Sequence, residues 1–340
     1  MQQLTDYLRD YTPRLDKYIH NYFDTQKQQA QTIDPFLTEC LSYLENYLLG
    51  GKKIRGALTV LGYQINKTMD INNIIPVSAA IELIHSGLLI QDDFIDHDLM
   101  RRGIKSIHEL YTNRKDPHFG ASMAVVIGDL GYFYGYKIIS DSDFAPVFVI
   151  KSLSELSQRL VNTGYGEILD VVSDNKLPLS RGTIDKARIY KTAHYSFVMP
   201  LSVGAILAGA TDFQLQAIEK YGTQVGLAFQ IQDDILGVTG DPEVTGKSNS
   251  SDITSGKQTH ILQKTLELGD PQFIKKYYGT NKKTDEIRKL MQGCGAIDAC
   301  KKLAQDHANQ AKRYLGKITT NEKVKIILSQ LADFVVTRNK

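Results

Sequence analysis

The stretch PVSAAIELIHSGLLIQDDFIDHDLMRRG, residues 76–103, joins a long apolar run to a dense cluster of acids. Within it, Ile81, Ile84 and Leu88 recur at i, i+3 and i+7, which is the spacing of one helix face. Pro76 stands at the front of the run, and the first turn of a helix tolerates proline. The stretch therefore predicts a buried helix whose far end carries carboxylates.

The same helical spacing recurs along the chain. Leu227, Ile231 and Ile235 repeat at i, i+4 and i+8 in a second apolar run. The nine prolines are each expected near a helix boundary, as at Pro35. Because no alternating apolar run meets a turn signal, no hairpin is predicted. The sequence predicts an all-α fold, a helical bundle that forms a single domain over residues 1–340.

Composition excludes several classes of protein. The 40 basic and 38 acidic residues leave a net charge of +2, so no global positive field favours nucleic acid. No uninterrupted apolar window approaches the roughly 18 residues of a transmembrane segment, and the polar N-terminus has no apolar signal core. Cys40, Cys294 and Cys300 match neither a disulfide framework nor a zinc site. These features predict a cytoplasmic protein.

The first acidic cluster predicts a metal site. Asp92 and Asp96 are separated by one helical turn, so their carboxylates share a face that the neighbouring Asp93 can join. Like charges at this spacing repel, and a helix C-terminus disfavours anions. A divalent cation reverses both effects, and carboxylate oxygens are ligands that Mg²⁺ prefers. A solvated acidic helix end is the alternative interpretation.

A second apolar helix ends in the same way. GLAFQIQDDILGVTGD, residues 226–241, carries Asp233 and Asp234, and the next acid is Asp241 in a long loop over residues 239–257. Two buried helices that both end in aspartates are harder to explain by chance than one. If the two ends face each other across a cavity, they can hold several metal ions around a diphosphate.

Basic and polar side chains in further motifs suit phosphate groups. Each alone is more often an ordinary surface lysine or a histidine at the edge of the core. Their joint occurrence with both acidic clusters is what predicts a binding site. These side chains are Lys52, Lys53 and Arg55 in GGKKIRG, His85, Arg101, Arg102, Lys191 and Thr192 in YKTAHYSF, and Lys247 and Lys257 beside the long loop.

Together these motifs resemble those of the trans-isoprenyl diphosphate synthases, the polyprenyl synthetase family, most clearly over residues 45–260. GGKKIRG resembles the family's GGKxxR, and DDFIDHDLMRRG resembles its first aspartate-rich motif. GEILD, YKTAHYSF, FQIQDD and TGKSNSSDITSGK resemble its GQxLD, lysine–threonine, second aspartate-rich and lysine-loop motifs. The resemblance implies an all-α isoprenoid synthase bundle around a central active-site cavity.

The resemblance also implies a role for each matching position. Asp92, Asp93, Asp96, Asp170, Asp233 and Asp234 are the implied ligands of Mg²⁺, with three ions per site. Arg101, Lys191, Lys247 and Lys257 are implied to hold an allylic diphosphate. Lys52, Arg55, His85 and Arg102 are implied to hold isopentenyl diphosphate. Thr192 and Gln230 are implied to face the allylic carbon.

Two positions depart from the family pattern. Gly237 stands where the second motif usually has its last aspartate, and Glu167 stands where glutamine is common. On the helix before Asp92, neither Gly87 nor Leu88 is aromatic, so we expect room for a product near C20. The expected floor of that tunnel is a later aromatic run, Tyr132, Phe133 or Tyr136.

Two alternative functions stay open at this point. Terpene cyclases share the fold and DDxxD, but they replace the second aspartate pair with an Asn/Ser/Glu motif. Non-catalytic regulatory subunits of prenyl diphosphate synthases lose part of an aspartate motif, and Gly237 is such a loss. The family also implies a homodimer, for which the apolar helix over residues 123–139 is the candidate interface.

Overall fold

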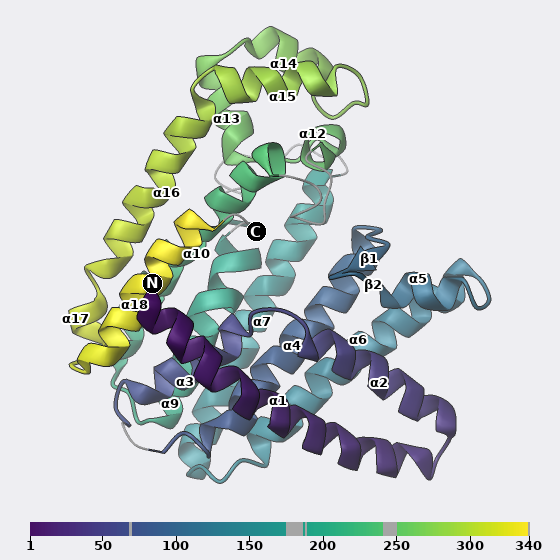
Figure 1. The fold of residues 1–340 in the computed structure, drawn as a ribbon, viewed down its shortest axis with the longest axis vertical. Helices are drawn as coiled ribbons and strands as arrows, with labels where there is room; N and C mark the ends of the chain where they lie inside the picture. Colours follow the sequence, from purple (N-terminus) through teal and green to yellow (C-terminus); the bar gives the residue numbers. More distant parts are fainter. Residues whose placement is uncertain (68–69, 175–185, 188, 241–249, 339–340) are drawn as a thin grey trace.

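The structure, a computed structural model, describes residues 1–67, 70–174, 186–187, 189–240 and 250–338. Helices α4, α6, α7 and α10 run through the middle of the molecule, and α13 to α15 gather at one end (Figure 1). This arrangement confirms the predicted all-α fold.

The first half of the chain contains α1 Gln2–Gln31, α2 Pro35–Leu49, α3 Ile54–Gln64, α4 Ile74–Ile95, α5 Ile107–Thr112, α6 Pro117–Ser140 and α7 Pro146–Asp174. The second half contains the π-helical η1 Ile189–Val198, α9 Met199–Leu207, α10 Asp212–Thr239, α12 Ser251–Ser255, α13 His260–Leu268, α14 Pro271–Tyr277, α15 Thr284–Gly293, α16 Ala296–Lys312, α17 Leu315–Ile318 and α18 Glu322–Thr337.

An aspartate–proline pair begins three of these helices. At Asp34–Pro35, Asp116–Pro117 and Asp270–Pro271 the aspartate side chain accepts backbone N–H bonds from the first turn. The proline that follows lacks an N–H that the first turn would leave unpaired in any case. The predicted helix starts at Pro35 and Pro271 are therefore confirmed.

Pro13 contradicts the expectation that every proline lies at a helix boundary. It lies inside α1, a helix of 30 residues in total. A proline there removes one helical hydrogen bond, which costs roughly 3 kcal/mol. The helix persists because Leu15, Ile19 and Phe23, spaced one turn apart, bury their side chains completely or almost so in the core.

A short hairpin is present that no signal in the sequence indicated. β1 Met100–Arg101 pairs antiparallel with β2 Ile104–Lys105. The two turn residues, Arg102 at φ 52° and Gly103 at φ 83°, are both left-handed, as a two-residue hairpin turn of the primed type requires. The sequence signal was weak because arginine rarely occupies such a position.

Helix α4 forms the centre of the core. It packs most extensively against α6, and its apolar side chains, including Ile74, Ile81 and Ile84, are completely buried. In the described part of the chain it is also the one helix long and apolar enough to cross a membrane. Because 78% of that apolar window is buried inside the protein, α4 has the character of a core helix.

Candidate active site

One cavity of about 630 Å³ collects nearly all the residues that the motifs predict. It lies where α4, α7, η1, α10 and the loop before α3 meet. Of the predicted residues, those that line it are Lys52, Lys53, Arg55, His85, Asp92, Asp96, Arg101, Arg102, Asp170, Lys191, Thr192, Gln230, Asp233, Asp234 and Lys257. Lys247 and Asp241 lie outside the described residues.

The first acidic cluster forms where α4 ends. Asp92 lies in the last turn and Asp96 caps the helix, so both reach the cavity one turn apart. Asp93 differs from the prediction, because its side chain is completely buried and is not among those that line the cavity. It accepts hydrogen bonds from the Tyr47 hydroxyl at 3.0 Å and from Arg101 Nε at 2.6 Å. Asp93 therefore orients Arg101 from behind the site.

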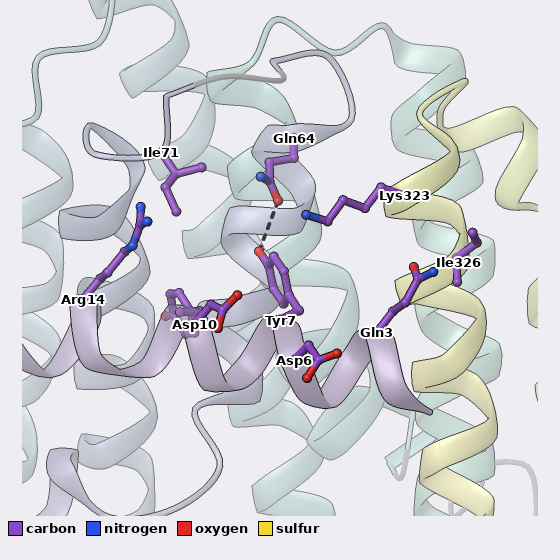
Figure 2. A pocket seen from close by; sticks show the side chains of 10 residues that line it. Gln3, Asp6, Tyr7, Asp10, Arg14, Gln64, Ile71, Lys323 and Ile326 are labelled. Carbon is purple, nitrogen blue, oxygen red and sulfur yellow. Dashed lines mark hydrogen bonds between the residues drawn. The ribbon is translucent and has the colours of Figure 1, made fainter.

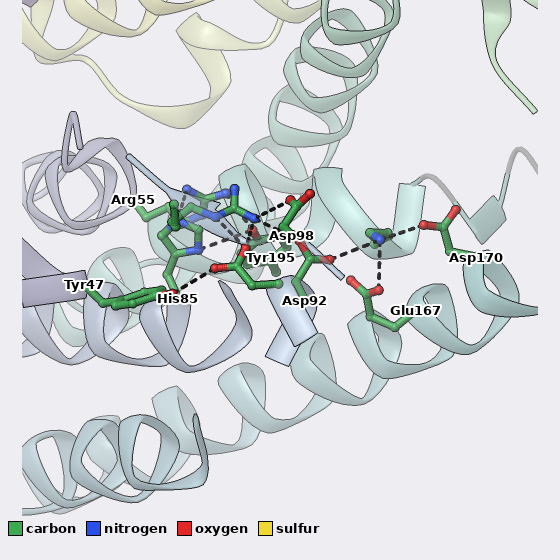
Figure 3. Close-up of polar contacts among 11 residues, drawn as sticks. Tyr47, Arg55, His85, Asp92, Asp98, Glu167, Asp170 and Tyr195 are labelled. Atoms are coloured by element: carbon green, nitrogen blue, oxygen red, sulfur yellow. Dashed lines mark hydrogen bonds and ion pairs between the residues drawn. The ribbon is translucent and has the colours of Figure 1, made fainter. Parts of the chain in front are cut away.

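Three carboxylates converge on the Lys191 ammonium. Lys191 Nζ lies 2.7 Å from Asp170, 2.9 Å from Glu167 and 3.5 Å from Asp92 (Figure 3). Although burial favours the neutral amine, these carboxylates raise the pKa of Lys191 well above its ordinary value. Burial raises the pKa of Glu167 to about 7, and Lys191 opposes the rise. The three carboxylates are stabilised by a neighbouring positive charge, which the Lys191 ammonium provides.

Two glycines hold the segment that carries Lys191. A Cβ at Gly166 of α7 would lie 2.4 Å from the Lys191 backbone nitrogen. A Cβ at Gly226 of α10 would lie 2.3 Å from the Ala193 Cβ. The π-helix η1 is thus clamped between two helices at backbone contact distance. No signal in the sequence indicates this role, although Gly166 lies in the GEILD motif.

Thr192 and Gln230 contact each other in the cavity. Thr192 on η1 donates a hydrogen bond from its hydroxyl to Gln230 Oε1 on α10 at 2.9 Å. Both side chains line the cavity beside the carboxylates. Their oxygens place negative ends of dipoles in the cavity, where they can stabilise a positive charge.

A second polar group, centred on Arg55, contacts η1 one turn after Thr192. Arg55 shares a hydrogen bond with His85 Nε2 at 3.0 Å and donates to the Tyr195 and Ser196 hydroxyls, both at 2.8 Å. Burial, followed by the charge of Arg55, lowers the pKa of His85 well below its ordinary value, so the imidazole is neutral. Tyr195 and Ser196 belong to YKTAHYSF, but no role for them was predicted from the sequence.

The hairpin brings Arg102 against the GGKKIRG loop. Gly51 has a φ of 86°, which favours glycine, and a Cβ there would lie 2.7 Å from the Arg102 guanidinium. Lys52 reaches the cavity and lies over the Phe334 ring, 4.9 Å from its centroid. Lys53 turns inward, is 3% exposed and donates to the Leu48 carbonyl, so it is structural.

The two aspartates of the second cluster have different environments. Asp234 is buried and accepts a hydrogen bond from the His260 backbone N–H at 2.8 Å. Asp233 is more exposed and pairs with Arg338 at 2.6 Å, just beyond the end of α18. Arg338 also lies 3.8 Å from the centroid of the Phe229 ring. No motif in the sequence indicated Arg338, because its position is set by the return of the C-terminal helix.

The aromatic run of α6 differs from the predicted tunnel floor. Phe133 is 66% exposed and therefore faces away from the cavity. Tyr132 is half-buried, donates to Gln91 Oε1 at 2.8 Å and lies within 3.3 Å of a Cβ built on Gly87. The α4 side chains that line the cavity are on a different face of the helix from the one that Tyr132 approaches, and Ile84 packs into the core.

A second hollow of about 570 Å³ lies between α1, α3 and α18 (Figure 2). Its lining combines Asp6, Asp10, Arg14 and Lys323, and the Tyr7 hydroxyl donates to Gln64 at 3.2 Å. None of the predicted site residues that the structure describes lines this hollow. The chemistry predicted from the sequence therefore belongs to the larger cavity.

The sequence profile of the polyprenyl synthetase family matches residues 35–294. The chain belongs to the polyprenyl synthetase family. A short chain isoprenyl diphosphate synthase of Methanocaldococcus jannaschii is 34% identical to it over 296 residues, 85% of this chain and 86% of that one. A geranylgeranyl diphosphate synthase of Methanosarcina mazei is 29% identical over 290 residues, with 85% and 86% covered.

A solved structure agrees with these relatives. The geranylgeranyl pyrophosphate synthase from Corynebacterium glutamicum, complexed with isoprenyl diphosphate and magnesium, has a TM-score of 0.89 and 25% identity, covering 97% of this chain and 99% of that one. The protein is thus a prenyltransferase with the isoprenoid synthase fold.

The donor set of the cavity fits magnesium. Within the described ranges, no three acidic, histidine or cysteine side chains already converge as a metal site. The Lys191 ammonium nevertheless lies among three carboxylates, where a hard divalent cation finds the oxygen ligands it prefers. Asp92, Asp96 and Asp170 from one side, and Asp233 from the other, are the side chains available to it.

Proposed function

We propose that this prenyltransferase condenses isopentenyl diphosphate with an allylic diphosphate, head to tail and with Mg²⁺, to give a linear all-trans product near C20. The observation that carries the proposal is the single cavity in which both aspartate clusters meet the basic side chains. The names of the relatives, geranylgeranyl and short chain isoprenyl diphosphate synthase, support the reaction and the product length.

The side chains divide the cavity into two halves with different tasks. Lys191 and Lys257, beside the carboxylates, hold the allylic diphosphate. Arg55 and Lys52, with the neutral His85 as a hydrogen-bonding partner, hold isopentenyl diphosphate. Arginine and lysine bind diphosphate oxygens through charge-assisted hydrogen bonds. The two substrates thereby meet between η1 and α10.

The reaction needs no nucleophilic side chain. When the allylic C–O bond breaks, its electron pair leaves with diphosphate, and the cationic side chains stabilise that charge. The allylic carbon becomes positive beside the oxygens of Thr192 and Gln230. The double bond of isopentenyl diphosphate forms the new C–C bond, and a proton is lost to the departing diphosphate.

Three Mg²⁺ ions are proposed per site. When bound, they neutralise the diphosphate and so favour its departure. Asp92, Asp96 and Asp170 are the proposed ligands on one side of the cavity, and Asp233 is the proposed ligand on the other. Asp93 and Asp234 remain in the proposal as supporting acids, because each is buried and already hydrogen-bonded.

The product length is proposed from Leu88, which is not aromatic and lies one turn before Asp92. A Cβ on Gly87 would lie 2.5 Å from the Gly128 carbonyl oxygen, so Gly87 is a close packing contact with α6 and leaves no free space. Leu88→Phe is expected to shorten the product, because its ring adds bulk one turn before Asp92. Chromatography of the dephosphorylated alcohols measures this, and an unchanged distribution would count against a tunnel on this face.

A homodimer is also proposed. One face of the predicted interface helix is core, as Ala124, Ile127 and Ile138 are buried. The other face exposes apolar side chains, and α7 adds more beside it: Val125, Val126, Phe133, Ile150, Tyr165 and Ile168. Such a patch is typical of a protein interface. Sedimentation of Phe133→Glu is expected to show monomer, whereas Phe213→Glu, at an equally exposed phenylalanine on α10, keeps the dimer.

A single domain and a cytoplasmic location complete the proposal. The buried apolar side chains form three core clusters. Tyr7 and Leu8 pack against two of them, and Val336 packs against the third and one of those two, which supports one folding unit. The three cysteines are free thiols, as a reducing compartment requires.

Incubation with Mg²⁺, labelled isopentenyl diphosphate and dimethylallyl, geranyl or farnesyl diphosphate tests the reaction. Linear alcohols of increased length, lost with chelator or in Asp92→Ala, are the expected result. Cyclic hydrocarbons from an allylic substrate alone would instead indicate a cyclase. No turnover by a folded protein would indicate a regulatory subunit.

A further inference from the structure

A buried carboxylate on α4 faces the start of α3, in the half of the cavity that carries Lys52 and Arg55. Glu82 is 5% exposed and lines the cavity one helical turn before His85. An acid beside cations that hold a diphosphate is unexpected, because it repels the anion. The position of Glu82 is therefore explained by what it binds within the protein.

Its partner is the backbone of α3. This helix begins at Ile54, and the side chain of the preceding residue, Lys53, does not cap it. The first N–H groups of a helix have no partner within the helix, and the helix N-terminus favours a negative charge. The Gly56 N–H donates a hydrogen bond to Glu82 Oε1 at 2.7 Å. A side chain of α4 thus supplies the cap that α3 lacks in its own sequence.

The absence of a side chain at Gly56 allows this close approach. A Cβ there would lie 3.1 Å from Glu82 Cγ, 3.0 Å from the Ser78 carbonyl oxygen and 2.2 Å from the Tyr11 hydroxyl. Helices α1, α3 and α4 therefore meet at this one residue.

Two successive turns of α4 hold neighbouring residues of α3. Glu82 binds the backbone of Gly56. One turn later, His85 shares a hydrogen bond with the Arg55 side chain at 3.0 Å. The backbone that carries Arg55 and the guanidinium at the end of its side chain are thus fixed from the same helix.

We infer that Glu82 is a positioning residue for isopentenyl diphosphate, because its hydrogen bond to Gly56 fixes the start of α3 and with it Arg55. This inference rests on the proposed function. Glu82 acts through α3, so the allylic diphosphate, held by Lys191 and Lys257 from other elements, is not affected.

Three substitutions separate the hydrogen bond from the charge. Glu82→Gln keeps an acceptor at the same reach and removes the charge. Glu82→Asp keeps the charge on a side chain that is shorter by one carbon–carbon bond, about 1.5 Å. Glu82→Ala removes both. Titration calorimetry with Mg²⁺ measures the affinity for isopentenyl diphosphate, and the elongation assay gives the KM for the allylic substrate.

Glu82→Asp and Glu82→Ala are expected to bind isopentenyl diphosphate about 10-fold more weakly, the scale of one hydrogen bond to a charged group. Glu82→Gln is expected to bind it at least as tightly as the wild type, because the acceptor remains and a repelling charge is gone. The KM for the allylic substrate is expected to stay at the wild-type value in all three.

Glu45→Ala is the matched control for a purely structural effect. Glu45 on α2 is also 5% exposed, pairs with His20 and Lys27, and does not line the cavity. Urea unfolding is expected to show lower stability in both Glu45→Ala and Glu82→Ala. Only Glu82→Ala is expected to lose affinity for isopentenyl diphosphate.

Wild-type or tighter binding in Glu82→Ala would overturn the inference, because the carboxylate would then only compete with the diphosphate for the N-terminus of α3. Glu82→Gln that binds as weakly as Glu82→Asp would also overturn it, since the charge and not the hydrogen bond would matter. Failure of the proposed function looks different. In that case the wild type binds isopentenyl diphosphate but elongates no allylic substrate, whereas the affinities still separate the variants.

Discussion

The clamp on η1 makes Gly166→Ala a sensitive test of how the fold positions Lys191. A methyl group at 166 would lie 2.4 Å from the Lys191 nitrogen and 2.8 Å from its Cα. An ordinary carbon contact is about 3.5 Å, so η1 must shift by about 1 Å. Overpacking of this kind costs about 1–3 kcal/mol, and alanine returns up to about 1 kcal/mol of helix propensity. Because the obstacle is backbone, we expect a net loss of about 2 kcal/mol.

Activity is expected to fall further than stability. Lys191 Nζ lies 2.7 Å from Asp170 and 2.9 Å from Glu167, and both of these acids follow Gly166 on α7. A displacement of about 1 Å in a positioned group can cost about 100-fold in rate. We therefore expect Gly166→Ala to elongate an allylic substrate about 100-fold more slowly while it still folds.

Urea unfolding and the elongation rate, measured at one protein concentration, test both expectations. Gly293→Ala is the control, because a Cβ on that helical glycine of α15 would have no neighbouring atom within 4 Å. It is expected to gain up to about 1 kcal/mol and to keep full activity. If Gly166→Ala matched the control in both measurements, the clamp would not position Lys191.

Two further predictions concern charge. Arg338→Gln frees Asp233 from its ion pair, and because Asp233 is 56% exposed the pair is worth about 0.2–1 kcal/mol. Mn²⁺ titration without diphosphate should therefore show up to about fivefold tighter binding, and weaker binding would mean that Arg338 supports the metal site. Burial, followed by the charge of Arg159, lowers the pKa of His194 from 6.5 to about 4, so the folded state favours neutral imidazole. The free energy of unfolding should fall by about 3 kcal/mol from this group as the pH drops from 6.5 to 4, and His194→Asn should lose that part of the slope.

The helices themselves were predictable from local chemistry. Ile81 and Ile84 repeat at helical spacing, and aspartate followed by proline begins α2 and α14. Acids at the ends of two apolar helices, together with the basic motifs, were enough to predict a diphosphate and metal site. These features depend on neighbours along the chain, so one sequence contains them.

Local rules failed where distant contacts outweighed them. Pro13 stays inside a helix because the apolar side chains around it are buried. Asp93, identical in type to its neighbour Asp92, turns away because Tyr47 and Arg101 bind it. Spacing alone cannot separate two adjacent aspartates whose partners come from other elements.

The sequence by itself determined the fold class and the family, and it predicted a set of site residues, because each follows from local periodicity and short motifs. Tertiary structure alone decided which acids reach the cavity and that Arg338, just beyond the end of α18, contacts Asp233. Those contacts join residues distant in the chain. Their free energies depend on distance, burial and charge in three dimensions, and no local pattern encodes them.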